Sequence, residues 1–153
     1  MNDRLRNLNY LAIVVTGLLA FVLSLVWYSP LLFGKIWMEH RNGLPPSAPA
    51  WTMFFAPLRE LIVSYVLALL ITRLAITDWK KAVGLIFLLW LAFQAVGMAG
   101  AIIWDNMPLK LGTVHAGDWL MKMLFMAVVL TLWHRKRITS GASRAGQPAG
   151  VKI

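Results

Sequence analysis

The chain has 153 residues, of which 59% are hydrophobic and only 14% are charged. So few charged side chains cannot cover a soluble globule of this size, which predicts a single helical domain lying mostly in lipid. Cysteine is absent, which excludes disulfide bonds, thiolate metal sites and thiol nucleophiles.

The first apolar segment predicts a membrane span over residues 9–29. It carries no charge between Arg6 and Lys35. This stretch is longer than the apolar region of a secretory signal, which has about 7 to 15 residues, so we interpret it as an uncleaved span. Small side chains form a ridge along it that is typical of helix packing in membranes, namely Thr16, Ala20 and Ser24.

A proline marks the expected end of this span. Pro30 has no amide hydrogen and disfavours helix at Ser29. Apolar residues then recur at helical spacing and predict a short helix in the outer interface, comprising Leu31, Leu32, Phe33, Ile36 and Trp37. Residues 42–49, rich in proline, predict turn and extended chain.

Two further spans are predicted over residues 55–74 and 116–134. The apolar runs after Glu60 and Lys122 hold only 12 and 11 residues before the next basic side chain. A bilayer core about 30 Å thick requires roughly 20 helical residues. Both spans must therefore include charged residues near one end, which are Arg59, Glu60, Asp118 and Lys122.

The third span is predicted over residues 82–104 and contains one strongly polar side chain, Gln94. We expect its amide to hydrogen-bond to a neighbouring helix, with the lining of a solute path as the alternative. Gly97 and Ala101, four residues apart, suit close helix packing.

The distribution of Lys and Arg predicts the orientation. With four spans, 10 of these residues fall on the side that holds both termini and 5 on the other side. The positive-inside rule then places both termini in the cytoplasm of a bacterial cell, in the inner membrane. Topology and attraction to anionic lipid at the cytoplasmic face account for the net charge of +9, so nucleic acid is not an expected partner. Residues 1–137 form the expected membrane domain, and residues 138–153 a disordered basic tail.

The four charged residues of the second and fourth spans gather near the external end. Asp118 and Lys122 share a helix face, and cross-helix pairs of Glu60 with Lys122 and of Arg59 with Asp118 are expected. We interpret the group as an externally open polar vestibule that binds a proton or cation at Glu60 or Asp118. The alternatives are a structural ion-pair cluster, or side chains that reach the headgroups. His115 lies near Asp118, but two such residues do not predict a metal site.

No catalytic arrangement is evident in the sequence. It holds no Gly-x-Ser-x-Gly, no glycine-rich phosphate loop and no HExxH motif. We therefore assign no catalytic residue, cofactor or metal, and an enzymatic activity is unsupported.

Two motifs resemble a known family. The first is the segment Trp27-Tyr28-Ser29-Pro30-Leu31-Leu32-Phe33-Gly34-Lys35-Ile36-Trp37, and the second is Pro108-Leu109-Lys110 followed by His115-Ala116-Gly117. They resemble a bacterial membrane family, domain of unknown function 1761, over about residues 9–133, with His115 where the family favours Asn. The resemblance implies a four-span fold of unknown function and adds no chemistry.

Two functions are therefore expected in order. The first is a protein that moves or senses a small solute through the external cluster, alone or as a homo-oligomer. The second is a non-catalytic accessory or assembly subunit, whose aromatic loop and basic tail contact a membrane partner and anionic lipid. In either case, we interpret the Trp27–Trp37 segment as an anchor for the first span, with a lid over the vestibule as the alternative.

Overall fold

The computed structural model describes residues 8–40 and 51–145, with backbone alone for residues 52, 53 and 135–145. Every regular element in these two ranges is helical. In chain order they are α1 (Tyr10–Trp27), α2 (Gly34–His40), α3 (Thr52–Arg73), α4 (Trp79–Leu89), the π-helical turn η2 (Trp90–Ala95), α5 (Val96–Trp104) and α6 (Leu109–Ala145). The expected turn at residues 42–49 lies outside the described residues.

Four helical rods are long and apolar enough to cross a membrane. They cover Tyr10–Trp27, Phe54–Arg73, Trp79–Trp104 and Leu109–His134. The third rod joins α4, η2 and α5, and the others belong to α1, α3 and α6. The all-helical, four-span fold predicted from hydropathy is confirmed.

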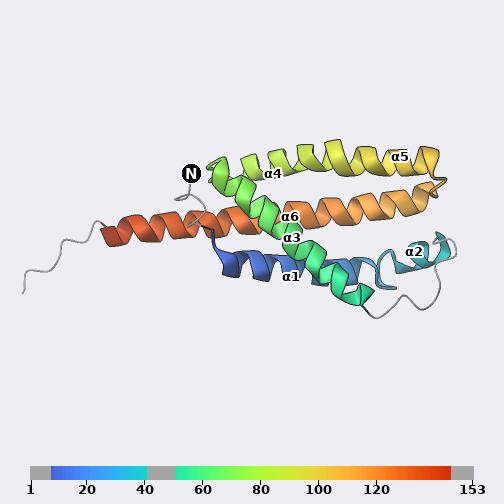
Figure 1. Ribbon diagram of the computed structural model, residues 1–153, viewed down its shortest axis with the longest axis horizontal. Helices are drawn as coiled ribbons and strands as arrows, with labels where there is room; N and C mark the ends of the chain where they lie inside the picture. Colours follow the sequence, from blue (N-terminus) through green and yellow to red (C-terminus); the bar gives the residue numbers. More distant parts are fainter. Residues whose placement is uncertain (1–7, 41–50, 146–153) are drawn as a thin grey trace, which may run out of the picture.

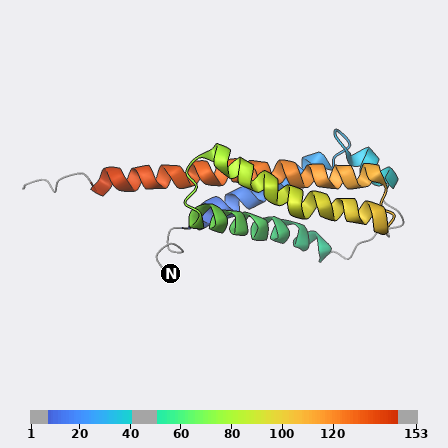
Figure 2. The same ribbon diagram turned by 90° about the horizontal axis from the view of Figure 1, so that it is seen from above.

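Helix α6 is the central element of the bundle. It lies between α1 on one side and the α4–α5 rod on the other, while α3 crosses it at an angle (Figure 1). It packs against each of the other helices, including α2 and η2. Seen from above, α6 continues well beyond the remaining helices (Figure 2). We call the opposite end of the bundle, which holds α2 and the α5–α6 connection, the α2 end.

The chain leaves α1 through a tight turn that explains the glycine in the first motif. The Phe33 amide donates to the Trp27 carbonyl at 3.1 Å, and the Gly34 amide donates to the Ser29 carbonyl at 3.0 Å. A Cβ atom at Gly34 would lie 2.5 Å from the Tyr28 carbonyl oxygen. The short helix predicted after the first span is present, but it begins at Gly34 because the residues before it form this turn.

The fourth span differs from its predicted limits at both ends. Helix α6 begins at Leu109 rather than at residue 116, directly after Pro108, whose carbonyl accepts from the Gly112 amide at 3.0 Å. A proline at the start of a helix needs no amide partner, so the sequence Pro-Leu-Lys opens the helix instead of extending the loop. The helix also continues to Ala145, into the segment predicted as a disordered tail. Residues 146–153 lie outside the described residues.

The apolar core fills the half of the bundle remote from α2. Its larger members are Ile13, Leu67, Ile71, Ile86, Met126 and Leu130. Nearer α2, α1 and α3 cross closely, because a Cβ atom at Gly17 would lie 3.2 Å from the Leu61 Cα atom. This close crossing brings the start of α3 against α1 and α6, where the charged residues lie.

Candidate functional site: a buried charge cluster

Three ionisable side chains are buried where α1, α3 and α6 meet. Glu60 on α3 and Lys122 on α6 are 0% exposed, and Asp118 on α6 is 1% exposed. We call Glu60, Asp118 and Lys122 the buried triad. Full burial of three such groups is unusual in any protein and requires that they contact one another.

The Lys122 ammonium links the two carboxylates. Its Nζ atom lies 2.8 Å from Glu60 Oε1 and 2.8 Å from Asp118 Oδ2. Asp118 precedes Lys122 by one helical turn, so the two share a face of α6 that looks toward Glu60. The predicted cross-helix pair of Glu60 with Lys122 is therefore present.

Helix α1 contributes a hydroxyl group to the triad. Ser24 Oγ donates to Asp118 Oδ1 at 2.8 Å, and both groups are buried. Both Asp118 oxygens thus have partners. Sequence analysis assigned Ser24 only to a packing ridge, and its signal as a ligand was its place one turn before the end of the first span, at the depth of the charges.

Arg59 covers the triad from one side. Its Nη2 atom lies 2.7 Å from Glu60 Oε1, and its side chain is 40% exposed. The guanidinium carbon lies 5.0 Å from the centre of the Trp119 ring, and Lys122 Nζ lies 4.7 Å from the same ring. The predicted pair of Arg59 with Asp118 is wrong, because Lys122 and Ser24 already occupy Asp118.

Two buried oxygen atoms at this level of α1 and α3 lack hydrogen-bond partners. They are Glu60 Oε2 and Thr16 Oγ1. Both carboxylates of the triad therefore share one ammonium, while one carboxylate oxygen makes no bond to the described part of the chain. Buried polar atoms are almost always satisfied, so such an exception requires a physical explanation.

The cluster is closed to solvent in this conformation, which differs from the expected open vestibule. A hollow of about 380 Å³ does lie near α2, but it is mostly apolar and none of the four charged residues lines it. Its lining consists of Trp27, Phe33, Ile36, Lys110, Thr113, Val114 and Gly117. The described side chains include no group of three His, Asp or Glu residues placed to hold a metal ion.

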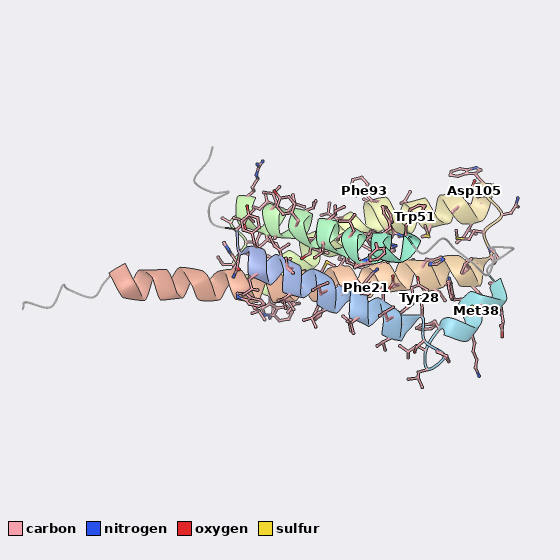
Figure 3. All side chains as sticks on the ribbon, turned by 60° about the horizontal axis from the view of Figure 1, so that its bottom comes forward. Phe21, Tyr28, Met38, Trp51, Phe93 and Asp105 are labelled. Atoms are coloured by element: carbon pink, nitrogen blue, oxygen red, sulfur yellow. The ribbon has the colours of Figure 1, made fainter. Side chains whose placement is uncertain are left out.

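His115 takes a partner outside the ion pairs. Its Nδ1 atom lies 2.7 Å from the Tyr28 hydroxyl group. Burial, and secondly the charge of Asp118, raise the pKa of the Tyr28 phenol, so the phenol keeps its proton and donates it to Nδ1. Tyr28 lies at the same end of the molecule as Met38 and Asp105 (Figure 3). His115 therefore helps to hold the end of α1 against α6.

The aromatic motif fastens this end of α1 in two further ways. Trp27 Nε1 donates to the Val114 carbonyl at 3.1 Å. A Cβ atom at Gly117 would lie 2.8 Å from the Trp27 ring, so glycine lets the indole lie flat on α6. The Trp27 ring also packs on Phe33 and the Tyr28 ring on Trp37, with centroids 4.4 and 5.5 Å apart.

Gln94 does not make the interhelical bond expected for it. Within the part of the chain that the structure describes, the link between the third span and α6 is made by Trp90, whose Nε1 donates to the Ala116 carbonyl at 2.9 Å. The preference of the large indole for α6 leaves Gln94 at the edge of the contact, half-exposed.

Fold and cluster together define a small polytopic membrane protein, a helical bundle with ionisable residues buried among its spans. The chain belongs to the family described as protein of unknown function (DUF1761), whose profile matches residues 11–131. This range contains the whole cluster and both motifs, and it confirms the resemblance found in the sequence. No curated protein and no solved structure matches the chain.

Proposed function

We propose that this protein moves or senses a small solute across the membrane, with the buried triad as its protonatable centre. The observation that carries the proposal is that three ionisable side chains lie fully buried in a lipid-embedded bundle and are not balanced in charge. Ionisable residues inside membrane spans are costly and mark ion and proton pathways. A purely structural pair would need only one carboxylate and one ammonium.

The free carboxylate oxygen favours Glu60 as the proton site. With both carboxylates ionised, the triad carries one negative charge in excess, and Glu60 Oε2 has no partner. Arg59 offsets this charge from a partly exposed position, where solvent weakens its effect. A proton bound at Oε2 makes Glu60 neutral and leaves a balanced pair of Asp118 and Lys122. Asp118 is the poorer site because both its oxygens are already bonded.

Proton uptake at Glu60 has a direct mechanical consequence. Both Arg59 and Lys122 contact the same oxygen, Oε1, so neutralisation of Glu60 weakens both contacts together. Arg59 then loses the charge that holds it over Trp119 and turns toward solvent. Removal of this cover opens the triad at the α2 end, which couples protonation to solute access.

Proteoliposomes containing the purified chain test this function. A pH-sensitive dye in the lumen should report proton movement when a gradient of the transported solute is applied, screened across small cations and amines. Glu60→Gln should abolish the movement, because the amide cannot take up or release the proton. Asp105→Asn removes a carboxylate from the exposed α5–α6 connection and serves as the matched control. Equal fluxes for Glu60→Gln and the unaltered chain would refute the proposal.

The orientation belongs to the same proposal. We place the protein in the inner membrane of a bacterium, with both termini in the cytoplasm and the α2 end outside. The support is the excess of Lys and Arg, 10 against 5, on the side of the termini. In this orientation the triad lies in the outer half of the membrane and anionic lipid contacts the basic side.

A second candidate is a non-catalytic accessory or assembly subunit. It is favoured by the apolar side chains that α2 and its preceding turn leave uncovered, since Leu31 is 88% and Met38 61% exposed. A stoichiometric membrane partner that co-purifies with the chain and is lost on deletion of residues 31–37 would support this function. Retention of the partner after that deletion would count against it.

A further inference from the structure

The third span is the least enclosed part of the bundle. Only 6% of its apolar window is buried, compared with 33%, 28% and 33% for the first, second and fourth spans. It packs mainly against α6, and its outer side carries apolar residues such as Phe93, which is 76% exposed and points away from the bundle (Figure 3). Apolar side chains facing lipid need no partner, so this exposure alone indicates nothing.

Gln94 is the exception on this span. It lies 15 residues after Trp79 and 10 before Trp104, so at about 1.5 Å per residue it is roughly 15 Å from the nearer end of the span. Its side chain is too short to reach the headgroups from there. No hydrogen bond in the described part of the chain involves its amide group, although amide groups in membrane spans are expected to find partners on other helices.

We propose that two copies of this chain associate through the third span, with their Gln94 side chains hydrogen-bonded to each other. A primary amide carries both a donor and an acceptor, so two such groups related by a two-fold axis satisfy each other. A single uncharged amide on an otherwise apolar face matches an identical face. It offers no charge to attract an acidic or basic partner.

The surroundings of Gln94 allow a second helix to approach closely. Gly97 lies one turn further along α5, and a Cβ atom at Gly97 would meet no atom within 4 Å. Ala101 follows at the next turn of the same face, and Trp104 ends it. Small residues beside a polar side chain let two backbones come close enough for their side chains to bond. Amide pairing and close approach thus coincide on one edge of the third span.

Disulfide cross-linking of the purified full-length chain in liposomes tests the interface, and the absence of native cysteine makes it clean. Single cysteines at Gly97 and Ala101 should form covalent dimers on mild oxidation. A cysteine at Ala92 on the opposite edge of the same helix, and one at Val22 on the lipid face of α1, should form few. Equal cross-linking at all four positions, or none at Gly97 and Ala101, would overturn the proposal.

Energy transfer between labelled chains in liposomes measures the role of the amide. Gln94→Leu should raise the dimer dissociation constant about three- to tenfold, the usual effect of one interhelical hydrogen bond. Gly97→Leu should raise it further by steric hindrance, whereas Ala92→Leu should leave it unchanged. An unaltered constant for Gln94→Leu would contradict amide pairing. Cross-linking in cell membranes to a chain of different mass, with the purified protein monomeric, would assign the face to another partner and refute self-association.

Discussion

The Lys122 Nζ atom on α6 lies 2.8 Å from Glu60 Oε1 on α3, inside the membrane-spanning part of the bundle. The same ammonium holds Asp118 at 2.8 Å. One positive group therefore holds two carboxylates together, and the stability of the bundle should depend on it strongly.

Replacement of Lys122 by Met should destabilise the protein severely. The change leaves two buried carboxylates without their shared cation, and loss of one partner of a buried ion pair costs about 3–5 kcal/mol. Thermal unfolding in detergent, followed by circular dichroism, measures the effect. Lys110→Met removes an exposed lysine from the start of the same helix and is the matched control.

A double variant separates charge from packing at this position. If the uncompensated carboxylates cause the loss, Glu60→Leu combined with Lys122→Met should recover part of the lost stability, because it removes one of them. A double variant less stable than Lys122→Met alone would show that Lys122 acts through its methylene packing instead.

Replacement of Ser24 by Ala should also lower stability, by about 1–3 kcal/mol, since it leaves Asp118 Oδ1 buried without a donor. The measurement is again thermal unfolding of the purified protein. Ser29→Ala is a suitable control, because its hydroxyl only accepts an exposed hydrogen bond from the Leu31 amide. Equal unfolding temperatures for both variants would indicate that Ser24 contributes packing alone.

Alkaline pH should loosen the contact between Tyr28 and His115. Burial raises the pKa of the Tyr28 phenol above its ordinary value of 10.0, so the folded protein holds this proton more tightly than the unfolded chain. The resulting stability is fully present below about pH 10 and is lost as the pH rises beyond it. Unfolding temperatures at pH 9 and pH 11 should differ more for the unaltered chain than for Tyr28→Phe. The opposite order would contradict this account.

The proposed orientation can be measured with single cysteines and a membrane-impermeant maleimide. Asn106 lies in the α5–α6 connection and Thr77 lies in the α3–α4 connection, at opposite ends of the third span. In intact cells, Asn106→Cys should be labelled at once, and Thr77→Cys only after the membrane is permeabilised. The reverse pattern would invert the topology and place the triad in the inner half of the membrane.

Much of the site was predictable, because burial in lipid restricts where charges can lie. Spans two and four were too short without their charged ends, so Glu60 and Lys122 had to lie at similar depth and were correctly expected to pair. Arg59 was assigned to the wrong carboxylate, since residue order does not show which side of α3 faces solvent. Gln94 was expected to bond within the chain, since hydropathy does not show that Trp90 makes the contact with α6.

Hydropathy and charge spacing are sufficient for the four spans, the depth of the charged residues and the likeness to a known family. These properties depend on how each short segment meets lipid and water, which composition records directly. The central place of α6, the hydrogen bond of Ser24 to Asp118, the closure of the cluster and the free Glu60 Oε2 atom required the packed helices. Such features depend on how each helix is rotated about its axis and which neighbours it meets, and these are properties of the whole bundle.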